Sequence, residues 1–278
     1  MSRTNVRKEK IEFVRCNLCG ADNSDNYILF EEYKYVKCRE CGLIYQNPRP
    51  MFNALKNRYS KKYFNYEFRN QENFFNLMKL ALKDLKFHEK IAPQFKVNNR
   101  KFLDIGSATG LLLNYIRQYG WEVTGVEICK ESAEYAKKNF KLNIINKTVE
   151  EAGFRKESFD IVHMSHVIEH VPSPFDTLKE INRILKKDGY LIITTPRVDS
   201  FQAGLFKETW RSYHRDHIYI FSKNTLKNML IKSGFKIKKF ITWGGIEKGR
   251  ANPFVKRIVD KLAKKFKFGD VMCFLAQK

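Results

Sequence analysis

The middle of this 278-residue sequence alternates between short apolar segments and amphipathic segments, and this alternation constrains the fold more than any other feature. Between residues 100 and 195 the apolar segments have the length and composition of buried strands, and helical spacing separates them. Such alternation is typical of an α/β fold with a doubly wound parallel sheet. The predicted strands are "KFLDIG", "WEVTGVEI", "LNIINKT", "SFDIVHMSH" and "GYLIITTP", followed later by "KIKKFITW" and "DVMCFLAQK"; the predicted helices are 110–118, 130–139, 175–186 and "NTLKNMLIKSGF".

A bend of small residues joins the first predicted strand to the first helix, in "KFLDIGSATGLLLNYI". Gly106, Ala108 and Gly110 let the backbone approach a ligand closely, and the helix N-terminus directs free N–H groups into the same space. The spacing D-x-G-x-A-x-G differs from the G-x-G-x-x-G of NAD-binding domains, which stay an alternative. Because Asp104 would repel a pyrophosphate, it suits a ligand with a cationic or hydroxyl-bearing centre.

An acidic residue follows the second predicted strand, in "VTGVEI". Glu127 stands where an acid commonly accepts hydrogen bonds from the hydroxyls of a bound ribose. These two acids point to a nucleoside that lacks a pyrophosphate and carries a positive centre, and S-adenosylmethionine (SAM) is such a molecule. The sequence therefore predicts SAM as the cofactor.

Several longer motifs add a family resemblance. The stretches "LDIGSATG", "GVEI", "FDIVHMSHVIEHVPSPFDTLKEINRILKKDGYLIITTP" and "RDHIYIFSKNTLKNMLIKSGFK" resemble the class I SAM-dependent methyltransferases over residues 98–278. Their order and spacing make this resemblance more specific than a lone glycine loop. It implies a Rossmann-like, doubly wound, seven-stranded sheet and a methyltransferase activity.

The same resemblance implies roles for matching residues. Asp104 would orient the methionyl end of SAM, and Glu127 would hold its ribose. Ala108 stands where the family frequently has glycine, and its methyl group should be tolerated. The other implied cofactor residues are Gly106, Ser107 and Gly110 in the bend, Ile128, Val149 and Glu150 around the adenine, and Ser165 and His166 beneath the methyl group.

Four of the six cysteines form two pairs ahead of the predicted sheet, in the pattern C-x2-C-x18-C-x2-C with a glycine after each pair. This spacing is typical of a four-thiolate zinc site, whereas a redox dithiol needs only one pair. All four ligand positions are filled, so the zinc would be structural. Together with "CGLIYQNPRP", the module resembles a bacterial methyltransferase subgroup associated with surface-sugar and secondary-metabolite pathways. The predicted ligands, in a zinc-ribbon-like module at 1–50, are Cys16, Cys19, Cys38 and Cys41.

Histidines follow both the fourth and the fifth predicted strand, and the resemblance implies that the acceptor pocket is built after the fifth. Methyl transfer to a hydroxyl requires alignment with the methyl group and removal of a proton, a task that suits histidine near neutral pH. In "WRSYHRDHIYIFS", His217 is the first candidate for the general base and His214 the second, with His166 as a further candidate. Alternatively, these histidines only fix the loop.

The stretch "HVIEHV" also resembles ubiquinone-pathway O-methyltransferases, whose matching residues can hold a divalent cation. Glu169 and His170 match that pattern, but His166 replaces an acid. Magnesium prefers oxygen ligands, so two histidines argue against it. Otherwise Glu169 and His170 would cap and brace the following helix.

Residues 51–97 are predicted as a helical linker or lid between the cysteine module and the methyltransferase domain at 98–278. Two prolines in "QNPRP" end the module. The stretch "NFFNLMKLALKDLKF" then places apolar residues on one helix face and lysines on the other. That apolar face would either cover the active site or pack elsewhere on the protein.

The net charge of +22 is unevenly distributed, because residues 101–200 balance 14 basic against 14 acidic residues. The excess on the flanking segments fits phosphorylated substrates, nucleic acid or an anionic membrane, or is a solubilising surface.

The leading prediction is O-methylation of a sugar-type, lipid-linked or other small-molecule hydroxyl. An RNA methyltransferase and a non-catalytic zinc-ribbon adaptor are the alternatives; Phe13, Tyr27 and Phe30 are expected to form the ribbon's core rather than to stack on bases.

No apolar run approaches the roughly 18 residues of a membrane span, and "MSRTNVRKEK" lacks the apolar stretch of a secretory signal. We therefore expect a cytoplasmic protein. Residues 251–268 predict a basic amphipathic helix between the last two strands. It would either make the protein membrane-peripheral or pack on the sheet or on a second subunit. The oligomeric state is not predicted.

Overall fold

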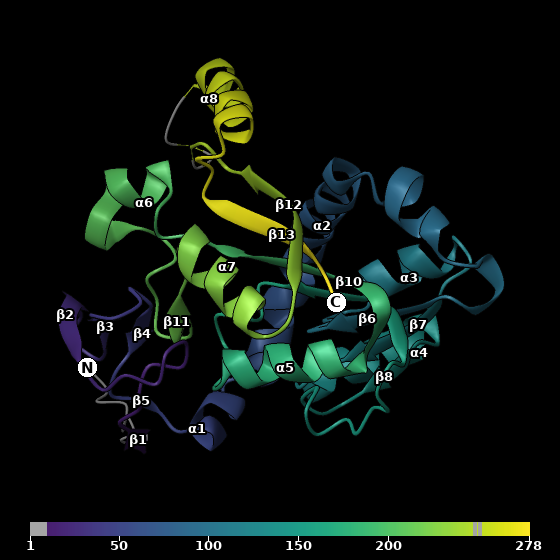
Figure 1. Ribbon diagram of the computed structural model, residues 1–278, viewed down its shortest axis with the longest axis horizontal. Coiled ribbons are helices and arrows are strands. Elements are labelled where there is room, and N and C mark those ends of the chain that lie inside the picture. The colour runs from purple at the N-terminus through teal and green to yellow at the C-terminus, as the bar shows by residue number, and fades with distance from the viewer. Residues whose placement is uncertain (1–9, 247–248, 250–251) are drawn as a thin grey trace.

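A seven-stranded sheet forms the centre of the protein, as the computed structural model shows for residues 10–246, 249 and 252–278 (Figure 1). The strand order is β12-β13-β10-β9-β6-β7-β8. The strands β6 to β10 are parallel to one another, whereas β13 is antiparallel to both of its neighbours, β10 and β12. The bounds are β6 Lys101–Ile105, β7 Glu122–Val126, β8 Asn143–Ile145, β9 Phe159–Ser165, β10 Leu185–Pro196, β12 Lys236–Trp243 and β13 Val271–Gln277.

Helices cover both faces of this sheet, as expected for strands that are apolar on both sides. One apolar core contains residues of α5 (Pro174–Ile184) and α7 (Lys223–Lys232). The other contains residues of α2 (Lys61–Leu85), α3 (Leu111–Arg117) and α4 (Lys130–Phe140). The predicted doubly wound α/β fold with seven strands is therefore confirmed.

The connections between these elements are short helices. Before the sheet lie α1 (Phe52–Lys56), the π-helix η1 (Phe87–Ile91) and two 3-10 helices, η2 (Ala92–Gln94) and η3 (Val97–Asn99). After β10 follow α6 (Phe201–Phe206) and the 3-10 helix η4 (Lys207–Thr209). The predicted helix 251–268 is α8 (Pro253–Phe266), between β12 and β13, and it stands at the top of Figure 1.

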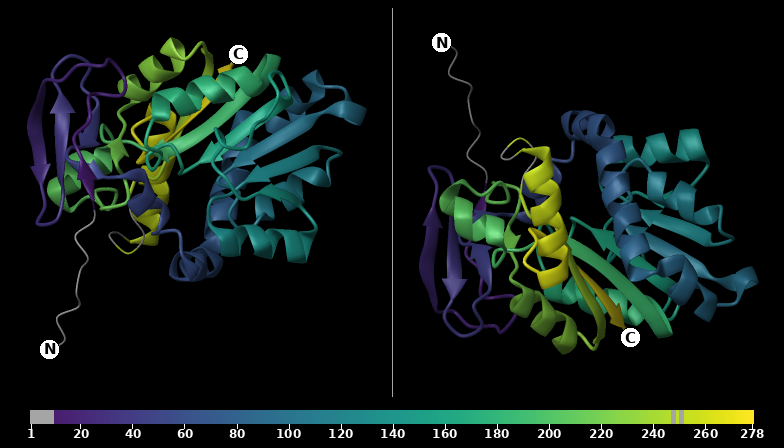
Figure 2. Two further views of the ribbon diagram at one scale, coloured as in Figure 1. Left: turned by 90° about the horizontal axis from the view of Figure 1, so that it is seen from below. Right: turned by 90° about the horizontal axis from the view of Figure 1, so that it is seen from above.

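The N-terminal segment forms a separate small sheet of order β11-β4-β3-β2. Its strands are β2 (Ser24–Leu29), β3 (Lys34–Cys38), β4 (Ile44–Gln46) and β11 (Tyr219–Ile220), while β1 (Ile11–Glu12) pairs with β5 (Arg49–Pro50). Strand β11 comes from a much later part of the chain. The cysteine module is thus joined by main-chain hydrogen bonds to the loop after β10, and Figure 2 shows it beside α6 at one end of the molecule.

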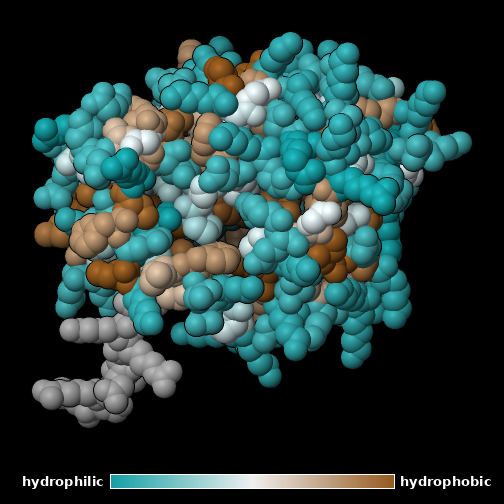
Figure 3. All heavy atoms as spheres, turned by 60° about the horizontal axis from the view of Figure 1, so that its bottom comes forward, coloured by the Kyte–Doolittle hydropathy of each residue, from teal (hydrophilic) through white to brown (hydrophobic). Residues whose placement is uncertain are grey.

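Two aromatic side chains of the cysteine module are exposed. Phe13 is 77% exposed and Tyr27 is 38% exposed, so the prediction that they form the ribbon's core is wrong. Phe30 packs against the buried cluster that contains Tyr35 and Trp210, as predicted. Hydrophobic side chains gather over this module at the left of Figure 3. Residues of the loop after β10 complete the ribbon's core, so this core forms without burying Phe13 and Tyr27.

Candidate active site

A cavity of about 320 Å³ lies at the carboxyl ends of β6, β7 and β9, within the usual size range of small-molecule sites. It is the position where a doubly wound sheet binds ligands. Seven residues predicted to contact the cofactor or substrate line it. They are Gly106, Glu127, Ile128, Val149, Glu150, Ser165 and His166.

The bend after β6 is shaped by its glycines. Gly106 has φ +73°, and a Cβ there would lie 2.4 Å from Val167 Cγ2. Gly110 has φ +82°, and a Cβ there would lie 2.9 Å from the Cβ of Ala136. Ala108 also has a left-handed backbone, with φ +47°, which explains why glycine suits this position. The bend therefore requires small residues for conformational and steric reasons.

Glu127 is buried beside this bend. Its Oε2 accepts a hydrogen bond of 2.9 Å from the Ala108 N–H, and its Oε1 accepts one of 2.8 Å from the Cys129 N–H. Burial, followed by the charge of Glu67, raises the pKa of Glu127 to about 8. A carboxyl held by two main-chain donors and facing a cavity is suited to the hydroxyls of a ribose.

Three predicted cofactor residues do not line the cavity. Asp104 is buried inside the sheet, where its Oδ1 lies 2.7 Å from His163 Nδ1 on the adjacent strand. Burial raises the pKa of the Asp104 carboxyl. Ser107 and Gly110 lie on the inner side of the bend, against the sheet and α4. Contacts of these three residues with SAM stay a prediction, and the Asp104–His163 pair was not anticipated from the sequence.

Helices α1 and α2 form another wall of the cavity. Tyr59, Tyr63 and Glu67 line it together with apolar residues of both helices. Glu67 is only 8% exposed, and its Oε2 accepts a hydrogen bond of 2.7 Å from Ser132 Oγ. Sequence reasoning did not identify Glu67, because an acidic residue in an amphipathic lysine-rich helix is normally exposed.

A cluster of histidines surrounds Glu169 on the opposite wall. His166 and His170 line the cavity. His217 lies behind them, with its ring 4.7 Å from that of His170, and His214 lies 3.7 Å from His217. His217 and His214, the first two candidates for the general base, are thus not among the lining residues.

The surroundings of this cluster favour an ionised Glu169 and neutral His217 and His214. Burial alone would raise the pKa of Glu169, but the neighbouring imidazoles, above all His166, lower it to about 2. Burial lowers the pKa of His217 well below its usual value and also lowers that of His214. His166 Nδ1 lies 3.3 Å from Glu169 Oε1, so a carboxylate adjoins an imidazole at the cavity wall.

Glu169, His170 and His217 could also hold a cation, since their ligand atoms lie within 4.8 Å of one another. His170 Nδ1 lies 2.7 Å from the Asp216 carbonyl oxygen, and His217 Nδ1 lies 2.9 Å from that of Ser212. A carbonyl only accepts, so each Nδ1 donates, and in the neutral form of each ring Nε2 is the nitrogen with a lone pair for a cation. Two imidazoles and a carboxylate suit zinc or another transition metal better than magnesium.

The cysteine module braces this histidine-bearing loop. Tyr35 Oη donates to the His217 carbonyl oxygen at 2.6 Å, and Gln46 Nε2 donates to the same oxygen at 3.0 Å. Arg49 Nη1 donates to the Pro172 carbonyl oxygen at 2.7 Å. Side chains of the ribbon therefore hold two loops of the methyltransferase domain.

The four cysteines predicted as metal ligands come together within the same module. Cys16 Sγ lies 3.4 Å from Cys41 Sγ, and Cys19 Sγ lies 3.5 Å from Cys38 Sγ. All four sulfur atoms lie within 4.8 Å of one another, which suits a tetrahedral thiolate site for zinc. Gly20 and Gly42, both with positive φ, donate to the carbonyl oxygens of Cys16 and Cys38 and close the two turns. The cluster fits a zinc-ribbon-like module.

The fold and this site together define the class of SAM-dependent methyltransferases. A solved SAM-dependent methyltransferase from Archaeoglobus fulgidus is 24% identical and has a TM-score of 0.55, covering 77% of this chain and 100% of that chain. One from Thermotoga maritima is 23% identical with a TM-score of 0.55, covering 77% of this chain and 98% of that chain. These similarities establish the class I methyltransferase fold.

A family described as "Methyltransferase domain" matches residues 71–239, so this chain belongs to that family. Among curated relatives, a ubiquinone biosynthesis O-methyltransferase from Haemophilus ducreyi is 28% identical over 51% of this chain and 59% of the relative. Another from Pelagibacter ubique is 33% identical over 41% of this chain and 48% of the relative. The matched region thus spans about half the length of these relatives.

Proposed function

We propose that this protein transfers the methyl group of SAM to a hydroxyl of a small molecule, of sugar type or linked to a lipid. The observation that carries the proposal is a single cavity with Glu127 on one wall and His166 on another. The first wall suits a nucleoside, and the second suits removal of a hydroxyl proton. The names of the O-methyltransferase relatives agree with an oxygen acceptor.

On the cofactor side, Glu127 would accept hydrogen bonds from the ribose, and Ile128 and Val149 would contact the adenine. Gly106 would leave room for the chain that carries the sulfonium. Only glycine fits at this position, because any Cβ there would collide with Val167. SAM, when bound, supplies an electrophilic methyl group. The walls contributed by α1 and α2 would exclude water, which otherwise competes with the acceptor.

On the acceptor side, we assign the general base to His166. The carboxylate of Glu169 lies 3.3 Å from its Nδ1 and would orient the ring and stabilise its protonated form. His217 does not line the cavity, which supports a positioning role for it through His170 and Glu169. His214 would support His217 in the same way.

The experiment is a methyl-transfer screen with isotopically labelled SAM against lysate fractionated into small molecules, lipids and RNA. We expect label in the small-molecule or lipid fraction, and His166→Asn should lower the rate about 10²–10⁴-fold with little change in SAM affinity. His88→Asn is the matched control, because His88 lies in η1 and is not among the residues that line the cavity. Label confined to RNA would favour the RNA alternative, and intact protein that fails to bind SAM would favour a non-catalytic adaptor.

A further inference from the structure

Helix α8 presents an apolar face to solvent. Ala263 is its only buried residue among those that the structure describes. Phe254 is 67% exposed and Phe266 is 64% exposed. A surface helix of a globular domain normally turns its apolar face to the core, so this orientation needs another explanation. The exposed apolar residues of α8 are Phe254, Val255, Ile258, Leu262 and Phe266.

Polar contacts fix α8 in this orientation. Asp260 Oδ1 accepts a hydrogen bond of 2.8 Å from the Gly245 N–H, and Lys264 Nζ lies 2.6 Å from Asp84 Oδ1. Thr242 Oγ1 donates to the Ala263 carbonyl oxygen at 3.1 Å. The side of the helix that faces the protein carries Asp260, Lys264 and Ala263, together with the partly buried Val259. The apolar side of α8 could turn toward the protein only if these contacts were broken.

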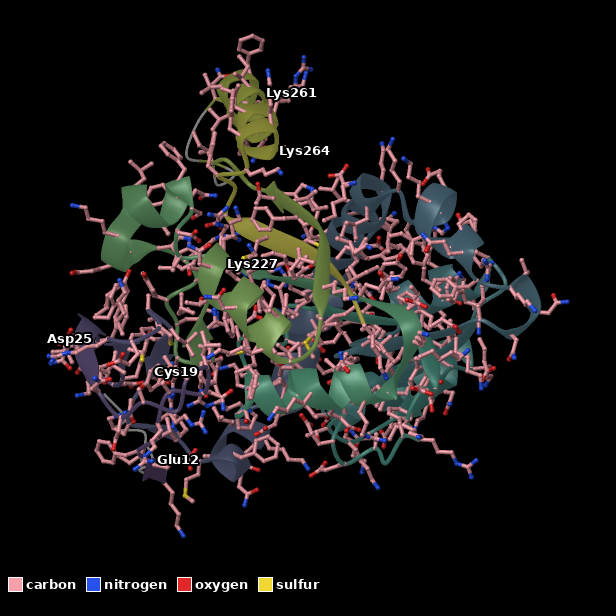
Figure 4. The ribbon with its side chains drawn as sticks, viewed as in Figure 1. Glu12, Cys19, Asp25, Lys227, Lys261 and Lys264 are labelled. Atoms are coloured by element: carbon pink, nitrogen blue, oxygen red, sulfur yellow. The ribbon has the colours of Figure 1, made fainter. Side chains whose placement is uncertain are left out.

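Basic residues border the apolar face. At the helical repeat, the five exposed apolar residues span about 120° of the helix circumference. Lys265 lies within this arc, and Lys261 and Arg257 follow at its edge. Lys261 and Arg257 have no acidic partner in the described part of the chain. Figure 4 shows Lys261 and Lys264 on α8, at the top of the molecule. Cationic side chains beside exposed aromatic ones are typical of helices that lie in a membrane interface.

We propose that α8 docks this protein onto an anionic lipid membrane surface, with its apolar residues inserted among the lipids and its lysines against the headgroups. The charges favour this occupant over a second copy of the chain. A symmetric contact between two α8 helices would bring their basic residues together, whereas anionic headgroups attract them. Among the described residues no helix has the length and hydropathy to cross a bilayer, so the contact would be peripheral.

The neighbouring segment extends the apolar contact. Phe201 and Leu205 of α6 are 47% and 56% exposed. The Phe201 ring lies 5.9 Å from that of Phe268, which follows α8 directly, and the Phe201 N–H donates to the Phe268 carbonyl oxygen. These contacts tie α6, with its exposed apolar side chains, to the segment that follows α8.

The helix lies at the cavity end of the sheet. The chain leaves α8 into β13, whose Val271 pairs with Pro196 at the carboxyl end of β10. Two residues earlier on β10, Thr194 pairs with Ser165, which lines the cavity. Docking would therefore bring the cavity end of the sheet toward the lipid. The docking itself does not depend on the proposed methyl transfer.

Co-sedimentation of the full chain with vesicles tests this proposal. Phosphatidylcholine vesicles with increasing phosphatidylglycerol should pellet the protein at low salt, and the bound fraction should fall as salt screens the charges. Lys261→Gln with Lys265→Gln should lower the partition coefficient about five-fold for each charge removed. Phe254→Ser with Phe266→Ser should abolish pelleting. Lys227→Gln on α7 and Leu29→Ser on β2, both exposed and distant, are the matched controls.

Two results would overturn the proposal. One is no pelleting of the wild-type chain on the most anionic vesicles at low salt. The other is pelleting that the α8 variants leave unchanged, whatever the controls do. Sedimentation velocity without lipid is run in parallel: self-association that Phe254→Ser abolishes, without vesicle binding, would assign the face to a second copy instead.

Discussion

The hydroxyl of Tyr35 donates a 2.6 Å hydrogen bond to the main-chain carbonyl oxygen of His217, across a sequence separation of 182 residues. Tyr35 belongs to the cysteine module, and His217 belongs to the loop beside the cavity. Gln46 Nε2 donates to the same oxygen. The position of this loop therefore depends on the folding of the N-terminal module, so a metal bound at its cysteine cluster would indirectly influence the histidine-bearing wall of the cavity.

We predict that Tyr35→Phe will impair turnover more than cofactor binding. The substitution removes a buried hydrogen bond, which costs about 1–3 kcal/mol when the acceptor keeps no replacement. Since Gln46 still holds the oxygen, we expect a cost near the lower end and a folded protein. A lower kcat with an unchanged Kd for S-adenosylhomocysteine would support this; Tyr66→Phe, at an exposed site on α2, is the control. Unchanged kcat would show that the brace does not position the loop.

We predict one zinc ion per chain at the cysteine cluster. Cys38→Ser should release it, because a hydroxyl is a poor replacement for a thiolate, and should unfold the module, since zinc-binding energy is folding energy in such sites. Elemental analysis measures the metal, and limited proteolysis should find new cleavage both in the module and near His217. Cys129→Ala, buried elsewhere, should retain the metal. Metal-free, well-folded wild-type protein would contradict the assignment.

Local patterns in the sequence were sufficient for the central sheet but not for the ribbon's partner strand. Segments such as Lys101–Ile105 and Lys236–Trp243 are strands as predicted, because their residue types and neighbouring turn signals act locally. Strand β11 has two residues and exists through pairing with β4, far away in the chain. No local periodicity can reveal such a strand, so the ribbon was predicted as an independent module.

Some residues of the candidate site were likewise predictable from local patterns, whereas others depend on tertiary packing. Gly106 and Glu127 were found from spacing along consecutive strands, and both line the cavity. Glu67 was missed because its burial depends on α2 packing against Ser132 of α4. The order of the candidate bases also depended on tertiary structure: only the folded chain places His166 on the cavity wall and His217 behind His170.

We predict that Ala108→Gly will stabilise the protein. Ala108 has φ +47°, and a left-handed backbone costs a residue with a Cβ about 1–2 kcal/mol. Glycine avoids this cost but loses more entropy on folding, so the free energy of unfolding should rise by about 0.5–1 kcal/mol. Denaturant unfolding provides the measurement. Ala133→Gly, in the right-handed backbone of α4, should instead destabilise by about 1 kcal/mol or more. A loss of stability in Ala108→Gly would mean that the alanine methyl makes favourable contacts that outweigh the strain.

We predict that binding of S-adenosylhomocysteine releases a proton near neutral pH. Burial and the charge of Glu67 raise the pKa of Glu127 to about 8, so the free protein holds a proton there at pH 7. Ribose hydroxyls that donate to the carboxylate favour its ionised form and lower this pKa, so binding should release the proton and tighten as pH rises toward about 8. Calorimetry at pH 7 in buffers of different ionisation enthalpy measures the number of protons released. Glu127→Gln should bind more weakly and release none from this position, whereas Glu134→Gln, exposed on α4 beside Lys130, should behave as wild type. Wild-type binding with the same heat in every buffer would contradict the assignment of Glu127 to the ribose.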